Sequence, residues 1–215
     1  MKLFVIFFAI AIIIIGGVFV WRSLKIDKTA KIKENSMSDD LKDKKIAMVI
    51  AFRDFQDEEY FVSRETLEGA GAEIAVVSSS LGKAIGKMGG EAEVNILIKD
   101  LKVADYDAVL FIGGPGAANY IDDETYHKIA RETVENNKVL GAICIAPAIL
   151  ARAGVLAGKK ATVWSSVMDK SAVKILKNSG AIYQPEPVVV DRKIITAAGP
   201  FAAKDFAEKI IEILK

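Results

Sequence analysis

Short apolar runs alternate with longer amphipathic stretches from Ile46 to the end of the chain. A short, nearly continuous apolar run is typical of a strand buried on both faces of a parallel sheet. Apolar residues at helical spacing, ended by glycine or started by aspartate, predict helices. The predicted strands are 46–51, 73–78, 106–112 and 139–143, and the predicted helices are 57–70, 122–137, 170–178 and 201–215.

Other segments complete this pattern. Residues 81–90 are rich in glycine and predict a β-excursion, and residues 160–164, 188–190 and 193–196 are rich in β-formers. Strands alternating with helices predict one α/β domain over residues 45–215. We expect a flavodoxin-like three-layer sandwich with a mainly parallel sheet.

The first part of the chain has a different character. Residues 3–21 carry no charge, and as a helix they would extend about 28 Å, close to the hydrocarbon thickness of about 30 Å. Trp21 ends the run, where indole rings favour the membrane interface. The only Ala-x-Ala motif in this part of the chain, Ala9 to Ala11, lies inside the apolar run, which disfavours a cleaved signal peptide. Residues 1–21 are therefore predicted to be an uncleaved transmembrane anchor, and the polar residues 22–44 a linker.

The basic residues on either side of this run predict its orientation. Lys2 precedes it, whereas Arg22 and four lysines up to Lys33 follow it. Cytoplasmic flanks are enriched in such residues, so the large domain is expected in the cytoplasm, tethered to the lipid bilayer. The net charge of +1 and the lack of a basic patch with aromatic residues argue against nucleic-acid binding.

Cys144 is the only cysteine, and it stands where a predicted strand turns into a helix that begins near Pro147. An elbow holds such a residue at the carboxyl end of its strand and exposes it to free N–H groups of the new helix. These groups favour a thiolate over a thiol. A buried cysteine that acts as a small hydrophobic residue is the alternative interpretation.

Two further segments are expected to meet Cys144, because ligands bind beyond the carboxyl ends of central strands. One is the acidic segment 52–60, which could supply a carboxyl group for proton transfer. The other is the glycine turn 113–116. The N–H groups of Gly114 and Ile145 are candidate donors to an oxyanion.

These features together resemble the DJ-1/PfpI superfamily, also described as class I glutamine amidotransferase-like. The resemblance covers residues 45–215 and rests on the acidic first loop, IGGPG at 112–116, AICIAP at 142–147 and AGP at 198–200. It implies that Glu59 hydrogen-bonds the sulfur of Cys144 and that Gly114 and Ile145 form the oxyanion hole. It also implies a homodimer. A second acidic position of PfpI-like members falls on Gln56.

This chain also departs from that family pattern. Ile145 and Trp164 stand where family members have histidine, and the only histidine is His127, in a predicted helix and expected at its surface. A Cys-His-acid triad is therefore not supported. The expected pocket residues are Gln56, Gly113, Pro115 and Trp164; no cofactor is expected, and the sequence offers no metal ligand set.

Three functions remain open from the sequence. The first is a membrane-anchored protein whose Cys144, supported by Glu59, acts on small reactive carbonyls, as glyoxalase-like or deglycase-like members do, or senses oxidants. The second is a PfpI-type cysteine peptidase or amidase. The third is a redox-responsive or holdase-like binding module without catalysis.

Overall fold

The computed structural model describes residues 39–215. The anchor predicted at 3–21 lies outside these residues, as does most of the predicted linker. In the part of the chain that the structure describes, no helix is both long and apolar enough to cross a bilayer.

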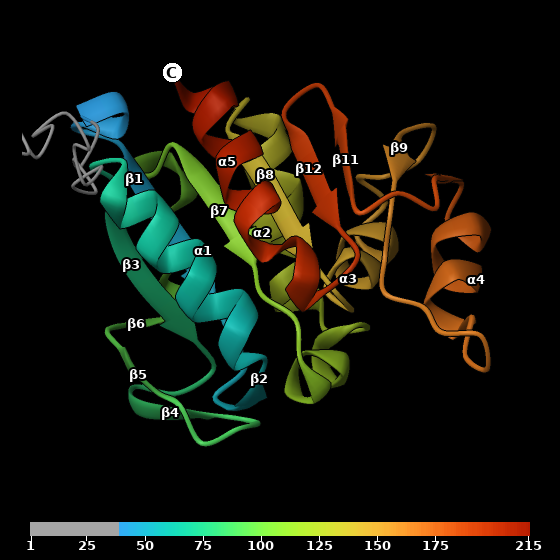
Figure 1. Ribbon diagram of the computed structural model, residues 1–215, viewed down its shortest axis with the longest axis horizontal. Coiled ribbons are helices and arrows are strands. Elements are labelled where there is room, and N and C mark those ends of the chain that lie inside the picture. The colour runs from blue at the N-terminus through green and yellow to red at the C-terminus, as the bar shows by residue number, and fades with distance from the viewer. Residues whose placement is uncertain (1–38) are drawn as a thin grey trace, which may run out of the picture. The chain divides into compact units, whose positions relative to one another are not determined.

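A seven-stranded sheet forms the centre of the described domain (Figure 1). Its strand order is β11-β12-β8-β7-β1-β3-β6, and every neighbouring pair is parallel except β11 with β12. Its strands are β1 (Lys45–Val49), β3 (Glu73–Ser78), β6 (Ile96–Leu97), β7 (Ala108–Phe111), β8 (Val139–Ile143), β11 (Val188–Asp191) and β12 (Ile194–Ala197).

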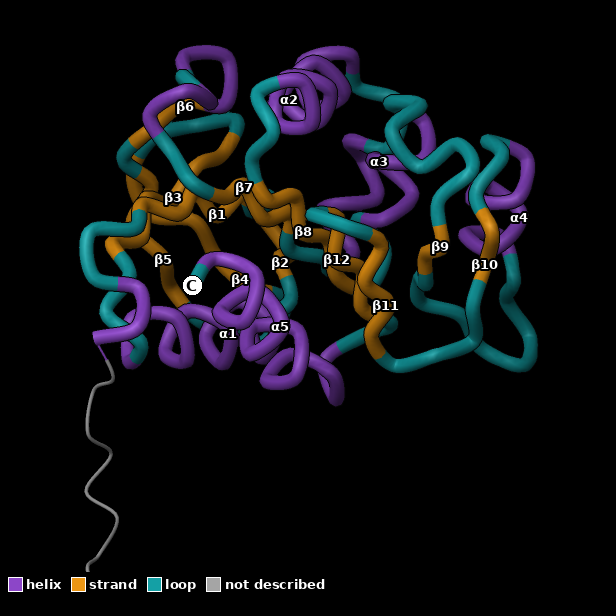
Figure 2. The backbone as a smooth tube through the Cα atoms, turned by 90° about the horizontal axis from the view of Figure 1, so that it is seen from above, coloured by secondary structure: helices purple, strands orange, loops and turns teal. Residues whose placement is uncertain are grey.

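Helices cover both faces of this sheet (Figure 2). Helices α1 and α5 lie on one face, and α2 and α3 lie on the other, while α4 lies beyond the β11 edge. The helices are α1 (Asp57–Gly69), α2 (Glu124–Glu135), α3 (Pro147–Arg152), α4 (Ser171–Asn178) and α5 (Ala203–Leu214). The continuous apolar strands predicted from the sequence are explained by this double cover.

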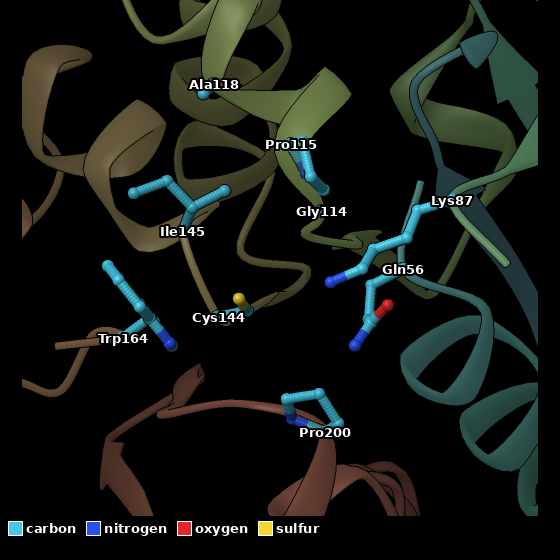
Figure 3. A pocket seen from close by; sticks show the side chains of 9 residues that line it. All are labelled: Gln56, Lys87, Gly114, Pro115, Ala118, Cys144, Ile145, Trp164 and Pro200. Atoms are coloured by element: carbon cyan, nitrogen blue, oxygen red, sulfur yellow. The ribbon is translucent and has the colours of Figure 1, made fainter. Parts of the chain in front are cut away.

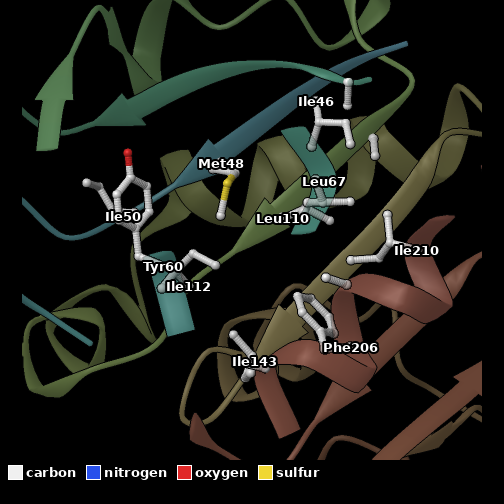
Figure 4. Packing of buried hydrophobic residues seen from close by; sticks show 14 of the residues in the cluster. Ile46, Met48, Ile50, Tyr60, Leu67, Leu110, Ile112, Ile143, Phe206 and Ile210 are labelled. Atoms are coloured by element: carbon white, nitrogen blue, oxygen red, sulfur yellow. The ribbon is translucent and has the colours of Figure 1, made fainter. Parts of the chain in front are cut away.

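Successive residues of β1 serve the two faces in turn. Ile46 and Met48 belong to the hydrophobic core under α1 and α5, whereas Ala47 and Val49 belong to the core under α2 and α3. In the first core, Leu110 of β7 and Phe206 of α5 are buried near Met48 (Figure 4). Fully burying a side chain of this kind contributes about 1.5–3 kcal/mol, so these contacts stabilise the packing of α1 and α5 on the sheet.

Two small sheets lie outside the main one. One contains β2 (Arg53–Phe55), β4 (Gly82–Gly86) and β5 (Glu91–Val94), and the other pairs β9 (Lys160–Ala161) with β10 (Ile182–Tyr183). Short 3-10 helices connect several elements: Asp39–Leu41, Ile98–Asp100, Val103–Asp105, Pro115–Tyr120 and Pro200–Ala202.

The structure confirms the α/β class and the mainly parallel sheet, and it corrects two details. The strand predicted at 160–164 is limited to β9 and belongs to the smaller sheet with β10, because it pairs with no strand of the main sheet. His127 is not a surface residue. It is only 8% exposed, and its Nε2 lies 2.8 Å from the carbonyl oxygen of Ile121.

Candidate active site

The three predicted segments meet at one edge of the sheet. They follow β1, β7 and β8, which are adjacent in the order β8-β7-β1 and parallel. Their carboxyl ends therefore lie side by side, as expected for the ligand site of an open α/β sheet.

Cys144 is held in a left-handed backbone conformation at the end of β8, with φ of 62°. Its N–H donates to the carbonyl of Ala197 in β12 at 2.9 Å, and its own carbonyl accepts the N–H of Trp164 at 2.8 Å. A residue other than glycine keeps such a conformation only where neighbouring structure holds it there. The elbow predicted from the sequence is therefore present, and its backbone is fixed on both sides.

The glycine turn allows close approach to this elbow. A Cβ atom on Gly113 would lie 2.6 Å from the Cβ of Cys144 and 2.7 Å from Oε2 of Glu59. Gly114 has φ of 112°, and a Cβ there would lie 2.4 Å from the backbone nitrogen of Gln56. Side chains at either position would push the three segments apart, so both glycines are required for the site's geometry.

Glu59 lies in the first turn of α1 and is fully buried. Its Oε2 accepts the N–H of Gly113 at 3.0 Å, while its Oε1 is buried without a nitrogen or oxygen partner among the described residues. The carboxyl group is within hydrogen-bonding reach of the Cys144 side chain. A proton on this carboxyl group is therefore expected on Oε1, because that oxygen receives no hydrogen bond from a described nitrogen or oxygen donor.

Burial raises the pKa of Glu59 to about 8, against the opposing effects of the hydrogen bonds with Cys144 and the Gly113 N–H. A carboxylate loses its hydration when it is buried, so the neutral form is favoured. At neutral pH the carboxyl group is therefore mostly protonated and can donate a proton.

The pKa of the Cys144 thiol is also raised, first by burial and then by the negative charge of an ionised Glu59. Hydrogen bonds from the backbone N–H groups of Gly114 and Ile145 lower it. The lowered pKa expected from the elbow is thus opposed by burial. Because the thiol and the carboxyl group are coupled, protonation of Glu59 removes the repulsion, and its O–H can then stabilise a thiolate.

A cavity of about 350 Å³ opens above the sulfur (Figure 3). This volume is at the small end of the range for ligand pockets. Most of its wall is apolar, and Gln56, Lys87 and Cys144 supply the polar groups. The lining residues are Gln56, Lys87, Gly114, Pro115, Ala118, Cys144, Ile145, Trp164 and Pro200.

Most residues selected from the sequence are brought together here. Gln56, Pro115 and Trp164 line the cavity with Cys144, Gly114 and Ile145, whereas Gly113 and Glu59 lie behind its wall. The sequence analysis missed three lining residues. Pro200 is the last residue of the AGP motif, which could have indicated it, and Ala118 follows the glycine turn, but no local pattern marks Lys87.

The described residues that line this pocket include no histidine and no group of metal ligands. His127 is not among its lining residues; besides the Ile121 carbonyl, its ring is paired with Glu124 at 3.4 Å. Within residues 39–215, no three side chains of histidine, cysteine, aspartate or glutamate are grouped so that they could hold a metal ion.

Comparison with known proteins agrees with this geometry. The model of the DJ-1/PfpI family matches residues 44–213, which includes the sheet, both helix layers and the elbow. The chain belongs to the DJ-1/PfpI family. The resemblance inferred from the sequence motifs is thereby confirmed.

This DJ-1/PfpI chain is similar to proteins from archaea and bacteria. It is 38% identical to the uncharacterized protein MJ0967 of Methanocaldococcus jannaschii, over 84% of this chain and 87% of that protein. It is 32% identical to a Bacillus subtilis protein named "Putative cysteine protease YraA", over 80% and 99% of the two chains. The crystal structure of a ThiJ/PfpI domain protein from Brachyspira murdochii superposes with a TM-score of 0.76 at 33% identity, covering 80% of this chain and 97% of that one.

Proposed function

We propose that Cys144 is a reactive nucleophile, that Glu59 is its proton donor, and that the pair acts on small reactive carbonyl compounds. One observation carries the proposal: the sulfur lies in the lining of a small cavity, between the buried carboxyl group of Glu59 and the N–H groups of Gly114 and Ile145. A nucleophile, a proton donor and oxyanion donors are the groups that addition to a carbonyl requires.

The chemistry follows from these positions. The thiolate attacks the carbonyl carbon, an S–C bond forms, and the electron pair of the C=O π bond moves to the oxygen. The N–H groups of Gly114 and Ile145 stabilise the negative charge on that oxygen, which then takes the proton of Glu59. The product is a hemithioacetal, and Glu59 is left ionised.

Oxidant sensing is a second candidate for the same pair. Cys144 is the only cysteine, so no second thiol of the chain can form a disulfide with it, and a peroxide would convert the thiolate to a sulfenic acid and then to a sulfinate. The N–H donors and the Glu59 proton next to the sulfur would stabilise the new oxygens.

Peptide cleavage is less well supported, although one relative carries the name of a cysteine protease. Expulsion of an amine needs a general acid that protonates the leaving nitrogen, for which cysteine peptidases use histidine. His127 lies outside the lining of the pocket and is engaged with Ile121 and Glu124. Incubation with casein would reveal such an activity, and we expect none.

The test is the rate of Cys144 alkylation by iodoacetamide as a function of pH, in the full chain and in Glu59→Gln. Only one cysteine is present, so every alkylation event reports this site. Burial raises the pKa of the thiol, but the O–H of a protonated Glu59 and the N–H groups of Gly114 and Ile145 act in the opposite direction. If this donor set stabilises the thiolate as the proposal requires, the apparent pKa in the unmodified chain lies below the free-thiol value of about 8.5. Glu59→Gln keeps the size of the side chain but replaces an acid donor by a weaker amide, and should move the apparent pKa back toward that value.

Two results would contradict the proposal. One is a thiol that stays inert from pH 5 to pH 10. The other is an ordinary pKa that does not respond to the change at Glu59. Either result would favour a binding module without catalysis.

A further inference from the structure

Lys87 gives the cavity a second chemical feature that the reaction of Cys144 does not require. Among the described residues that line the cavity, Lys87 alone is charged. Its ammonium group points into the cavity beside Gln56, across from the apolar side formed by Ile145 and Trp164 (Figure 3). The cavity is therefore apolar on one side and positively charged on the other, with the sulfur between them.

The backbone of Lys87 is fixed in place by the start of α1. The residue lies in the turn between β4 and β5, and its N–H donates to the carbonyl of Phe55 at 2.9 Å. Just after Lys87, the N–H groups of Met88 and Gly90 donate to the carboxylate of Asp57 at 2.8 and 2.7 Å. A Cβ on Gly90 would lie 2.5 Å from that carboxylate, so the turn sits directly against it.

The charge of Lys87 is also uncompensated within the described residues. Lys83, on the same hairpin, pairs with Glu91 at 2.8 Å, whereas Lys87 forms no ion pair with a described residue. Its field reaches the reactive pair, because it lowers the pKa of Glu59 against the dominant effect of burial. An ammonium group without an ion-pair partner among the described residues, carried by a held backbone at the wall of a small pocket, is suited to an anionic group of a ligand.

We propose that Lys87 is a specificity residue of this site and that the preferred substrate is a short aldehyde or ketone carrying a carboxylate. In the bound state the carboxylate lies at the Lys87 ammonium while the carbonyl carbon faces Cys144. The bond changes are those of the addition step above, and the carboxylate takes no part in them. This inference rests on the proposed reactivity of Cys144.

The test compares two alkylating reagents on the full chain. Iodoacetate and iodoacetamide share a leaving group and nearly a size, and differ in charge; in each reaction an S–C bond forms and iodide leaves. The ratio of their rates cancels the fraction of thiolate and measures the preference for an anion. We expect this ratio to exceed that of a cysteine-containing peptide and to fall as salt is added, because salt screens the interaction.

Lys87→Gln should lower the ratio about fivefold, the size of effect of a partly exposed charge pair. Lys83→Gln is the matched control, since it removes the same charge from the same hairpin outside the cavity, and it should leave the ratio unchanged. As a second readout, glyoxylate should protect Cys144 from iodoacetamide better than the neutral dialdehyde glyoxal. Lys87→Gln should remove this difference.

The outcomes separate the two proposals. If both reagents alkylate Cys144 and the ratio does not respond to Lys87→Gln, the specificity inference is overturned while the reactivity of Cys144 stands. If neither reagent reacts, the proposed function fails and the inference fails with it.

Discussion

Cys144 keeps a left-handed backbone conformation that costs an L-residue about 1–3 kcal/mol. The cost is offset by hydrogen bonds to β12 and Trp164 and by the burial of the surrounding elements. The conformation directs the side chain out of the sheet and toward Glu59. Strain at this one residue is therefore part of how the sulfur meets its proton donor.

The burial of Glu59 has a consequence for stability that depends on pH. Its folded pKa of about 8 is above the ordinary value of 4.5, so the folded state holds a proton that the unfolded state releases. Its contribution to stability is fully present below about pH 4.5 and is lost as the pH rises toward 8. In Cys144→Ala, where Glu59 titrates alone, we expect the free energy of unfolding to fall by about 1.4 kcal/mol per pH unit across this window.

Urea denaturation at pH 5 to pH 8 measures this slope, and Cys144→Ala combined with Glu59→Gln is the control that should lack it. In the unmodified chain the slope should be smaller once Cys144 ionises. The folded state then holds one proton, on Glu59, and the unfolded state also holds one, on Cys144. A flat profile in Cys144→Ala would show that Glu59 ionises normally, and the proton-donor role would fail.

At the scale of single residues, the sequence predicted the residues around the sulfur, but it did not predict Lys87 at the cavity wall. Cys144, Gly114 and Ile145 belong to strand ends, and the topology of a parallel sheet brings strand ends together. Lys87 reaches the site through a separate small sheet that docks on α1 through Asp57. Such contacts between distant segments leave no periodic pattern in the sequence.

At the scale of elements, the predicted boundaries were correct where residues within or next to the element determine where it begins and ends. The boundaries of β3 and β8 agree with the predicted 73–78 and 139–143. Residues 79–80 after β3 are serines, and β8 ends at the elbow before Pro147. Helix α2 begins after Asp123, whose carboxylate accepts the N–H of Thr125, as its capping position predicts. The predicted strand 160–164 is longer than the observed strand β9. The length of a strand depends on the neighbouring strand with which it pairs, and the sequence does not show that neighbour.

Asp57 couples two elements, so its removal should affect both stability and specificity. Asp57→Ala loses the hydrogen bonds to Met88 and Gly90, and we expect the free energy of unfolding to fall by about 1.5–3 kcal/mol. Removing a negative charge near the pocket should by itself raise the preference for iodoacetate over iodoacetamide. If Asp57 positions Lys87, the ratio should fall instead.

The opposite signs make this experiment decisive. Glu58→Ala is the control, because Glu58 is an exposed acid in the same helical turn and forms no hydrogen bond to the hairpin in the described residues. It should change stability little and should not lower the ratio. A raised ratio in Asp57→Ala would show that only its charge matters and that the hairpin does not depend on it.

At the scale of the whole molecule, the first described residues and the pocket lie at opposite edges of the sheet. The chain enters at the amino end of β1, whereas the cavity lies beyond the carboxyl ends of β1, β7 and β8. The end of the predicted linker 22–44 belongs to the described domain, because Leu41 is fully buried and its N–H donates to the carbonyl of Ala70. The remaining residues, 22–38, have a maximum extended length of about 60 Å.

We propose that residues 3–21 anchor this domain in a membrane. The full chain should remain in the membrane fraction after washing with alkaline carbonate. Ile12→Arg combined with Ile13→Arg places two charges near the middle of the apolar run, each at a cost of about 2.5–3.5 kcal/mol, and should release the protein. Ile12→Leu with Ile13→Leu is the control and should remain bound, and release of the unmodified chain would contradict the anchor.

The orientation is tested by trypsin, because the predicted linker contains Lys25, Lys28, Lys31 and Lys33. We expect trypsin to leave the protein whole in intact cells and to release the domain from inverted vesicles, since basic residues favour the cytoplasmic side. Cleavage in intact cells would place the domain outside. The side matters for the chemistry, because the reducing cytoplasm keeps Cys144 as a thiol, and a thiol in equilibrium with its thiolate is the form that adds to a carbonyl.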